Sequence, residues 1–278
     1  MTLHRAISLV LLVACGGGGG DDGGGPERPR TFGGDRPTML QVPTTFDEAK
    51  QYPLVMILHG YGASSFVQQA YFGMTELANE RDALVVAPDG IVDAGGKQFW
   101  NADPTCCDFG HLNPDDVGYL GGLIDDISAA WPVNRQAVYL VGHSNGGYMS
   151  YRMACERADV ITSIVVLAGY ASQVPCQPDS GVNVLHIHGS ADGTVPYSET
   201  SVDTWAGLDG CTGARTAGPT LDLDATLTGA ETQMAATGGC PTGGAVDLWK
   251  IEGGGHIPNL TDAFEAAVWP WLLDHPRP

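Results

Sequence analysis

The amino-acid sequence predicts an α/β fold in which a mostly parallel central sheet carries helices on both faces. Two observations lead to this prediction. Several short runs, such as "PLVMILHG" at residues 53–60, are continuously apolar, as expected of strands that are buried on both faces. These runs alternate with segments of helical periodicity, and repeated strand–helix units build parallel sheets.

The expected elements follow one another in a regular order. We expect strands at residues 53–60, 83–90, 136–143, 161–169, 182–189 and 245–253. We expect helices at residues 115–131, 145–157 and 262–275. The first of these helices has acidic residues in its first turn, where they suit the helix dipole, and the last contains Pro270, which favours a kink.

Two long segments, residues 93–113 and 210–244, show neither pattern and are predicted to be irregular insertions. Long loops in a compact domain are usually functional or disordered. The first insertion contains Trp100, Asn101 and the adjacent pair Cys106 and Cys107, so a functional role is favoured there.

The N-terminal residues have the features of a targeting segment. His4 and Arg5 precede the apolar run "AISLVLLVA", which is too short to span a bilayer as a helix. The run ends in "LVAC", which resembles the cleavage signal of bacterial lipoproteins. We therefore interpret residues 1–14 as a lipoprotein signal peptide and Cys15 as its lipidated residue. An ordinary secretory peptide with an incidental Cys15 is the alternative.

A glycine-rich stretch, "GGGGGDDGGGPERP", follows the targeting segment. It cannot build a core and is expected to behave as a flexible tether. We assign residues 15–36 to this tether and expect the folded part to begin near Pro37. A length of 278 residues fits one large α/β domain or two small ones, and we assign residues 37–278 to one catalytic domain.

The charge of the chain excludes two classes of partner. The formal net charge is -19 with only 13 Lys and Arg residues, which argues against binding to nucleic acid or to anionic membrane surfaces. The hydrophobic content of 43% is that of a globular protein.

Cysteine usage agrees with an oxidising compartment. Seven cysteines less Cys15 leave six, enough for three disulfides whose connectivity does not follow from spacing. Cys211 and Cys240 bracket a polar Gly/Thr/Ala segment with little core-forming potential, where a disulfide would be useful. A zinc site is not expected, because no C-x-x-C pair has a matching second pair.

The stretch "VYLVGHSNGGYMSYRMACE" presents a lone serine, Ser144, between glycines where a predicted strand ends and a predicted helix begins. A G-x-S-x-G pentapeptide is weak evidence in a chain with 39 Gly, but this context is typical of a nucleophile turn. Asp192 and His256 directly follow two later strands. Reactive groups lie at the carboxyl ends of strands in open α/β sheets, and the order Ser, Asp, His is that of α/β-hydrolases. We therefore predict a catalytic triad of Ser144, Asp192 and His256.

The chemistry of these residue types suggests their roles. The Ser144 hydroxyl becomes nucleophilic when the neutral His256 imidazole takes its proton, and the Asp192 carboxylate fixes the tautomer of that imidazole. The oxyanion of the tetrahedral intermediate needs donors placed in advance. We predict the backbone N–H groups of Asn145 and Tyr61 for this role, with Gly62 as the alternative to Tyr61. This chemistry requires no cofactor and no metal.

Four residues are candidates for substrate contact: Trp100, Asn101, His143 and Tyr197. For Trp100, the sequence is as compatible with a position in the hydrophobic core as with substrate contact. His143 is expected to pack beside the serine.

Other titratable residues are not expected to act in catalysis. His59 and His188 end strands and are expected to orient loops. Asp116 and Asp125 fit solvated or capping positions on a helix.

Six motifs in register, "LHGYGAS", "WNADPTCCD", "DDVGYL", "GHSNGGYMSYRMACE", "HGSADGTVPY" and "GGGH", resemble the esterase/polyhydroxybutyrate depolymerase family, which includes secreted feruloyl esterases and related carbohydrate esterases. The resemblance runs from about Pro53 to the C-terminus. It implies an α/β-hydrolase fold, with Ser144 as nucleophile, Asp192 as acid and His256 as base.

The resemblance also implies that Trp100 lies near the active site and that Cys211 pairs with Cys240. This sequence departs from the family after the histidine. Family members often continue with Trp-Pro-Gly, where "IPN" stands at residues 257–259. The departure puts the substrate pocket in doubt, but not the triad.

Together these observations predict an exported serine esterase, attached by lipid to a bacterial cell envelope or released outside the cell. It would cleave carboxylic esters through an acyl-enzyme, with a polyhydroxyalkanoate, feruloyl or acetyl ester as substrate, in polymeric or small form. An acyltransferase or a peptidase with the same triad is the first alternative. A non-catalytic binding protein that retains the fold is the second, but it would be favoured only by a missing triad residue.

Overall fold

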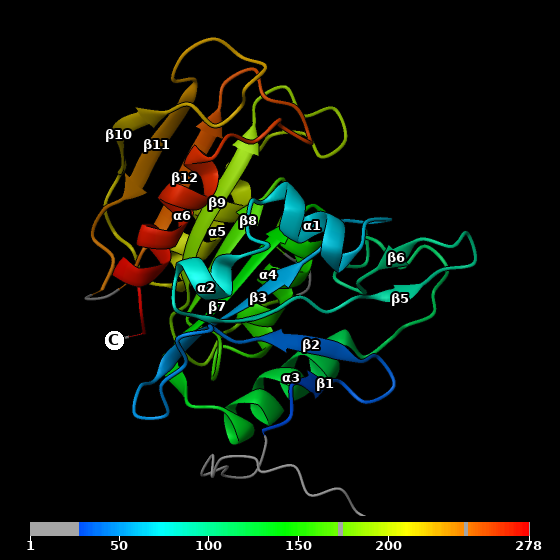
Figure 1. Cartoon of the computed structure of the whole chain (residues 1–278). Coiled ribbons are helices and arrows are strands. Elements are labelled where there is room, and N and C mark those ends of the chain that lie inside the picture. The colour runs from blue at the N-terminus through cyan, green and yellow to red at the C-terminus, as the bar shows by residue number, and fades with distance from the viewer. Residues whose placement is uncertain (1–27, 172–174, 242–243, 278) are drawn as a thin grey trace, which may run out of the picture.

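The computed structural model describes residues 28–171, 175–241 and 244–277, which build one ten-stranded sheet flanked by helices (Figure 1). The strand order is β1-β2-β4-β3-β7-β8-β9-β12-β11-β10. The central strands pair in parallel and are β4 (Leu84–Val86), β3 (Tyr52–Leu58), β7 (Val133–His143), β8 (Ser163–Leu167), β9 (Asn183–Gly189) and β12 (Val246–Ile251). The prediction of a mostly parallel sheet is confirmed.

Antiparallel strands extend the sheet at both edges. They are β1 (Thr31–Phe32) and β2 (Thr38–Gln41) at one edge and β11 (Thr232–Thr237) and β10 (Arg215–Leu221) at the other. A separate two-stranded sheet is formed by β5 (Ile91–Val92) and β6 (Gln98–Phe99).

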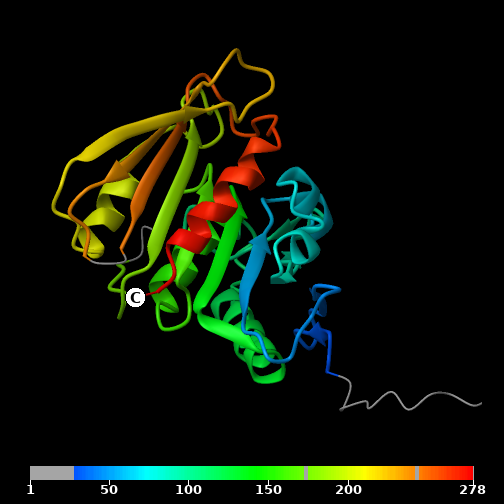
Figure 2. The same ribbon diagram turned by 60° about the vertical axis from the view of Figure 1, so that its left-hand side comes forward.

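Helices cover both faces of the sheet (Figures 1 and 2). One face carries α3 (Asp116–Ala130), α4 (Asn145–Glu156) and α5 (Thr200–Leu208), and the other carries α1 (Ser65–Tyr71), α2 (Leu77–Glu80) and α6 (Ala263–Asp274). Alternate residues of β3 serve the two resulting cores: Leu54 and Met56 pack with α3 and α4, whereas Val55 and Ile57 pack with α6. This division explains the continuous apolar runs of the sequence, since both faces of each central strand are buried.

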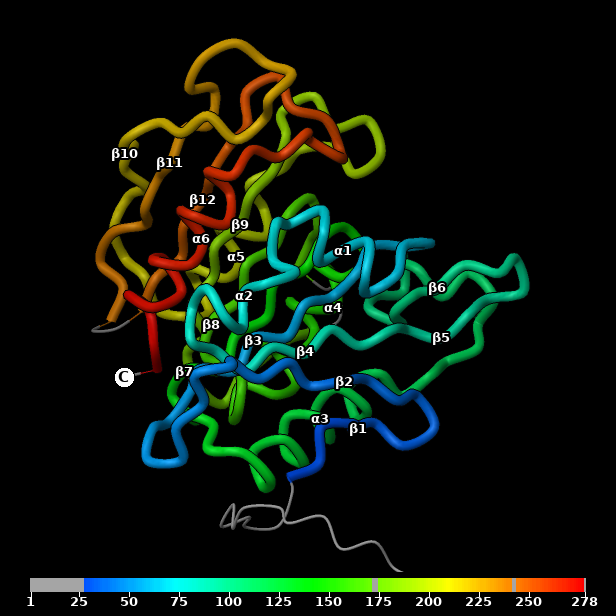
Figure 3. Tube along the Cα trace, viewed as in Figure 1, coloured from blue at the N-terminus to red at the C-terminus, as the bar shows by residue number. Residues whose placement is uncertain are grey.

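The N-terminal boundary of the folded part lies earlier than the predicted Pro37. Phe32 is buried in the core, the Trp131 indole N–H donates to the Pro29 carbonyl at 2.7 Å, and the Tyr119 hydroxyl donates to the Arg36 carbonyl at 2.7 Å. Figure 3 shows this segment, in blue, beside α3. The assignment of residues 28–36 to a flexible tether is therefore wrong. Tyr119 of α3 and Trp131, at the C-terminal end of α3, hydrogen-bond to the backbone of this segment.

The predicted signal peptide, Cys15 and most of the tether lie outside the described residues. Within the described ranges, no helix combines the length and the apolar character needed to cross a bilayer.

The second predicted insertion is not irregular throughout, because it contains β10 and β11. Met234 of β11 pairs with Trp249 of β12, so the hairpin continues the sheet. Most of β10 is exposed, which explains why its sequence lacks the periodicity of a half-buried strand. The Cys211–Cys240 disulfide closes the two ends of this segment, as the family resemblance implied.

Two further disulfides complete the connectivity that spacing alone did not reveal. Cys155 at the end of α4 pairs with Cys176, and Cys106 pairs with its neighbour Cys107.

The carboxyl group of Asp209, at the C-terminal end of α5, makes stability depend on pH. Its Oδ1 accepts a hydrogen bond from the Val182 N–H at 3.3 Å, while its Oδ2 is buried and has no partner among the described residues. Burial raises the pKa of Asp209 to about 7. The unfolded carboxyl has a pKa of about 3.9, so between these values folding requires proton uptake and stability falls as pH rises.

We therefore expect Asp209→Asn to stabilise the protein at pH 8 by about 1–2 kcal/mol, or about 2–8 °C in Tm, and to have little effect at pH 4.5. Thermal unfolding followed across this pH range measures the effect. Asp126→Asn, on the exposed face of α3, is the matched control and should be neutral at both pH values. A gain that does not change with pH would contradict the assignment to Asp209.

Candidate active site

The turn between β7 and α4 holds Ser144 in an unusual backbone conformation, and the residues around it are tightly packed. Ser144 has φ 51° and ψ -118°, in a region that L-residues rarely adopt. A Cβ atom at Gly142 would collide with the Gly146 carbonyl, and one at Gly146 would collide with the Leu58 carbonyl of β3. Both glycines of the pentapeptide are therefore required by close packing, and the serine hydroxyl is left at the carboxyl edge of the sheet.

Loops after β9 and β12 bring two side chains to this serine. His256 Nε2 lies 2.9 Å from Ser144 Oγ, and His256 Nδ1 lies 2.7 Å from Asp192 Oδ2. Asp192 accepts, so Nδ1 carries the proton and Nε2 is left to accept from the Ser144 hydroxyl. The structure thus joins the three predicted triad residues in one line of hydrogen bonds.

The Asp192 carboxylate is held in its ionised form. Its side chain has no exposed surface, and its Oδ1 accepts from the backbone N–H groups of Thr194 and Val195, both at 2.8 Å. Burial alone would raise the pKa of Asp192, but the hydrogen bonds from His256 and from the two backbone donors outweigh it and keep the pKa below its ordinary value. The carboxylate can therefore fix the His256 tautomer throughout the neutral pH range.

His143, the residue before the serine, supports the histidine loop. Its Nε2–H donates to the His256 carbonyl at 3.0 Å, and the two imidazole rings lie 5.1 Å apart. Burial lowers the pKa of His143 to about 4, so the ring is neutral at physiological pH. His143 lines the pocket over the serine, but its polar contact is with the protein backbone.

The two backbone N–H groups predicted to bind the oxyanion belong to Asn145 and Tyr61. Asn145 is the first residue of α4, and the N–H groups of the first helical turn have no intrahelical acceptor. The Tyr61 N–H comes from the loop after β3, which is held by His59: the His59 Nε2 accepts from the Gly90 N–H at 2.9 Å, so its Nδ1–H donates to the Gly60 carbonyl. His59 thus orients a loop, as the sequence suggested.

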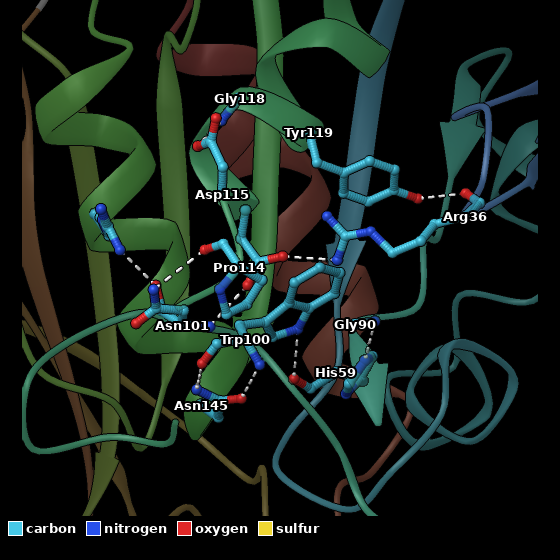
Figure 4. Close-up of polar contacts among 12 residues, drawn as sticks. Arg36, His59, Gly90, Trp100, Asn101, Pro114, Asp115, Gly118, Tyr119 and Asn145 are labelled. Carbon is cyan, nitrogen blue, oxygen red and sulfur yellow. Dashed lines mark hydrogen bonds and ion pairs between the residues drawn. The ribbon is translucent and has the colours of Figure 1, made fainter. Parts of the chain in front are cut away.

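Trp100 does not contact the pocket, and the prediction that it binds substrate is wrong. Its side chain has no exposed surface, and its indole N–H donates to the His59 carbonyl at 3.1 Å. Its backbone N–H and carbonyl are bound by the Asn145 side chain, at 2.7 and 2.9 Å (Figure 4). Trp100 therefore links the loop after β3 to the first residue of α4.

Asn101 also serves the scaffold rather than the pocket. Its backbone N–H donates to Asp116 Oδ2 at 2.7 Å, and its side chain donates to the Pro114 carbonyl at 3.1 Å (Figure 4). Asp116 is fully buried and forms an ion pair with Arg36 at 2.6 Å, so its prediction as solvated or capping is wrong, and Asp115 is the cap of α3. Asp125, in contrast, is half-exposed, as expected.

Tyr197 is not among the residues that line the pocket over Ser144. Its hydroxyl donates to Glu199 at 2.9 Å, and the edge-to-face contact of its ring is with His188.

The pocket over Ser144 has a volume of about 330 Å³. It is lined by Gly60, Tyr61, Ala63, Val67, Gln68, Tyr71, His143, Ser144, Thr194, His256 and Ile257. Sequence reasoning did not identify Val67, Tyr71 or Thr194, because only the fold brings α1 and the loop after β9 to the serine.

Across the described ranges, no group of three or more His, Cys, Asp or Glu side chains is arranged to hold a metal ion.

Known esterases resemble this chain in sequence. The profile of the family described as "Putative esterase" matches residues 30–222. "Putative esterase NocK" of Nocardia uniformis subsp. tsuyamanensis is 29% identical over 54% of this chain and 42% of its own length. Feruloyl esterase D of Neurospora crassa is 24% identical over 83% of this chain and 77% of its own length. Feruloyl esterase B of Piromyces equi is 26% identical over 80% and 42%. The chain thus spans less than half the length of two of these relatives.

Solved esterase structures share the fold. The acetyl xylan esterase from Aspergillus awamori has a TM-score of 0.61 at 14% identity, covering 85% of this chain and 94% of that one. A thermostable esterase has a TM-score of 0.58 at 16% identity, covering 89% and 62%. Likeness at this level of identity concerns the fold, which is that of α/β-hydrolases.

The clamp between the Asn145 side chain and the Trp100 backbone generates a stability prediction. Asn145→Ala removes two buried hydrogen bonds and leaves the Trp100 N–H without its acceptor, so we expect the free energy of unfolding to fall by about 2–4 kcal/mol. Urea unfolding measures the loss. Asn101→Ala, which removes one half-buried side-chain bond, should cost about 1 kcal/mol and is the control. Equal costs for the two variants would show that the clamp adds nothing.

Proposed function

Because the chain belongs to the esterase family whose profile matches residues 30–222, we propose that it is a serine esterase that hydrolyses carboxylic esters through an acyl-enzyme on Ser144. One observation carries the proposal. It is the unbroken row of hydrogen bonds from Ser144 through His256 to Asp192, at 2.9 and 2.7 Å.

The reaction follows from these contacts. Ser144 Oγ attacks the ester carbonyl while its proton passes to His256 Nε2, and the Asp192 carboxylate stabilises the resulting imidazolium. The oxyanion receives hydrogen bonds from the Asn145 and Tyr61 N–H groups. The tetrahedral intermediate then expels the alcohol, which takes the proton from His256. A water molecule, activated by the same imidazole, releases the acid and restores Ser144.

The pocket favours neutral substrates with an apolar acyl or aryl group. Val67 and Ile257 at the pocket are 54% and 68% exposed, and no Asp, Glu, Lys or Arg is among the residues that line it. Burying apolar surface contributes about 25 cal/mol per Å², so an aryl or medium acyl group gains several kcal/mol there. Relatives named feruloyl esterases support a feruloyl ester as substrate. The proposal extends to acetyl and hydroxyalkanoate esters, including polymeric ones, on the resemblance of the sequence motifs.

An acyltransferase or a peptidase would use the same row of side chains, since both form an acyl-serine. The neutral pocket favours the esterase over a peptidase that selects charged side chains. A binding protein without activity is disfavoured, because a strained serine conformation would then be retained without use.

Export completes the proposal. Three disulfides among the described residues fit an oxidising compartment, and the "LVAC" stretch before the glycine tether supports lipid attachment at Cys15. The net charge of -19 would disfavour adsorption to an anionic membrane surface, so attachment would depend on the lipid.

The substrate class is tested with the purified protein and a panel of esters and amides. We expect hydrolysis of p-nitrophenyl acetate and butyrate and of at least one feruloyl or hydroxyalkanoate ester, with peptide p-nitroanilides essentially untouched. Preferential cleavage of anilides would favour the peptidase. Transfer of the acyl group to an added alcohol in place of water would favour the acyltransferase.

Ser144→Ala is the control for this panel. It removes the nucleophile from a turn whose glycines remain, so the fold should survive and kcat should fall by about 10⁴–10⁶-fold. Near-normal turnover by folded Ser144→Ala protein would end the proposal.

Lipid attachment is tested by fractionation of a bacterial host that produces the full chain. We expect the wild type and Ser144→Ala to partition with membranes and Cys15→Ser to be released, because the acyl chains at residue 15 supply the membrane affinity. A mature wild-type protein found entirely in the soluble fraction would refute the attachment.

A further inference from the structure

A second imidazole reaches the Asp192 carboxylate. His188, on β9, lies with its Nε2 3.2 Å from Asp192 Oδ2, the oxygen that also binds His256, and 2.9 Å from the Val195 carbonyl. The His188 side chain has no exposed surface. The mechanism above gives this histidine no part.

His188 is the end of a longer row of buried side chains. Its Nδ1 lies 3.1 Å from His186 Nε2, two residues earlier on β9. His186 Nδ1 lies 3.0 Å from the Tyr151 hydroxyl of α4. Tyr151, His186 and His188 have no exposed surface, so these hydrogen bonds are buried away from bulk solvent.

The protons in this row can be assigned by elimination. His188 Nε2 faces two acceptors, the Val195 carbonyl and the Asp192 carboxylate, so it carries a proton. Burial lowers the pKa of His188, so the ring is neutral and its Nδ1 must accept. His186 Nε2 is therefore the donor to His188.

The same reasoning continues to the far end. Burial lowers the pKa of His186 well below its ordinary value, so this ring is also neutral and its Nδ1 accepts. Burial raises the pKa of Tyr151, so the phenol keeps its proton and donates it to His186. All three side chains thus donate in one direction. The last hydrogen bond, from His188 Nε2–H, goes to the Val195 carbonyl, and Asp192 Oδ2 lies 3.2 Å from the same nitrogen.

Resting on the proposed function, we propose that Tyr151, His186 and His188 are positioning residues that orient the Asp192 carboxylate and share its charge with His256. The two backbone donors hold Oδ1, and the His188 N–H, which is hydrogen-bonded to the Val195 carbonyl, also faces Oδ2 at 3.2 Å. Without that N–H, the carboxylate turns more freely and concentrates its charge on the His256 imidazole.

If Asp192 shares its charge between His188 and His256, removal of the His188 donor should shift the pH dependence of kcat/KM in one direction. A carboxylate that lacks the His188 donor stabilises the imidazolium of His256 more strongly. The acid limb of kcat/KM then moves to higher pH, because the imidazole must be neutral to accept the serine proton. Other titratable or charged groups face these imidazoles among the described residues. The His143 ring lies 5.1 Å from that of His256, the rings of Tyr170 and Tyr197 contact His188, and the charge of Arg215 acts on His186.

Two substitutions of His188 separate the donor from the space that it fills. The amide nitrogen of Gln lies near the position of Nε2, whereas that of Asn lies near Nδ1. We expect His188→Asn to lower kcat about 10-fold, with KM within about 2-fold, and to move the acid limb upward by about 0.5 pH unit. His188→Gln should restore most of kcat and the wild-type profile.

Tyr151→Phe is the second variant, since it removes a single oxygen and should fold even if His188→Asn does not. We expect a smaller change of the same kind, about 2–5-fold in kcat with an upward shift of the acid limb. Tyr52→Phe is the matched control, because it removes the buried hydroxyl that bonds to the Asp47 backbone, and it should leave kcat and the profile unchanged.

A spectroscopic measurement separates this proposal from the proposed function. The His256 Nδ1–H should give the most downfield proton resonance, recognised by its loss in His256→Gln. We expect that resonance to move in His188→Asn and Tyr151→Phe and to stay in Tyr52→Phe. Wild-type protein that is inert toward esters would refute the proposed function alone. Folded His188→Asn and Tyr151→Phe proteins with the wild-type resonance and the wild-type pH profile would overturn the proposal that these residues position Asp192.

Discussion

The close approach of α4 to β3 at Gly146 is the constraint on which the candidate site depends. No Cβ fits between Gly146 and the Leu58 carbonyl, so helix and strand meet backbone to backbone. The end of β3 leads to the Tyr61 N–H, and the start of α4 carries the Asn145 N–H. The positive φ of Ser144 occurs next to this contact, and the two N–H groups proposed to bind the oxyanion belong to the same two elements.

Buried polar groups then hold this geometry from two sides. Trp100, with no exposed surface, is bound through its backbone by Asn145 and through its indole N–H by the His59 carbonyl (Figure 4). On the acid side, Asp192 receives hydrogen bonds from two backbone donors and from His256, and His188 Nε2 lies 3.2 Å from its Oδ2. Each group is paired, so neither support carries the cost of an unsatisfied polar atom.

The groups around His256 differ in charge: Asp192 is ionised, whereas the buried imidazoles of His143 and His188 are neutral. The pKa of Asp192 is lowered, so it remains an anion, whereas burial lowers the pKa values of His143 and His188 and keeps both rings neutral. Asp192 is therefore the ionised group in direct contact with His256. In the proposed reaction, the imidazolium formed on attack by Ser144 would be stabilised by a carboxylate that is already ionised and already oriented.

The sequence by itself determined the central strands and the order Ser144, Asp192 and His256 at strand ends, because both depend on residue types and periodicity over a few neighbouring positions. Only the tertiary structure decided that Trp100 is buried, that residues 28–36 belong to the fold, that β10 and β11 extend the sheet, and how the four cysteines other than Cys211 and Cys240 pair. It also decided that His186 and His188 are joined to Tyr151. These features depend on partners far away along the chain, and a polar or exposed segment carries no local signal of the surface that will cover it.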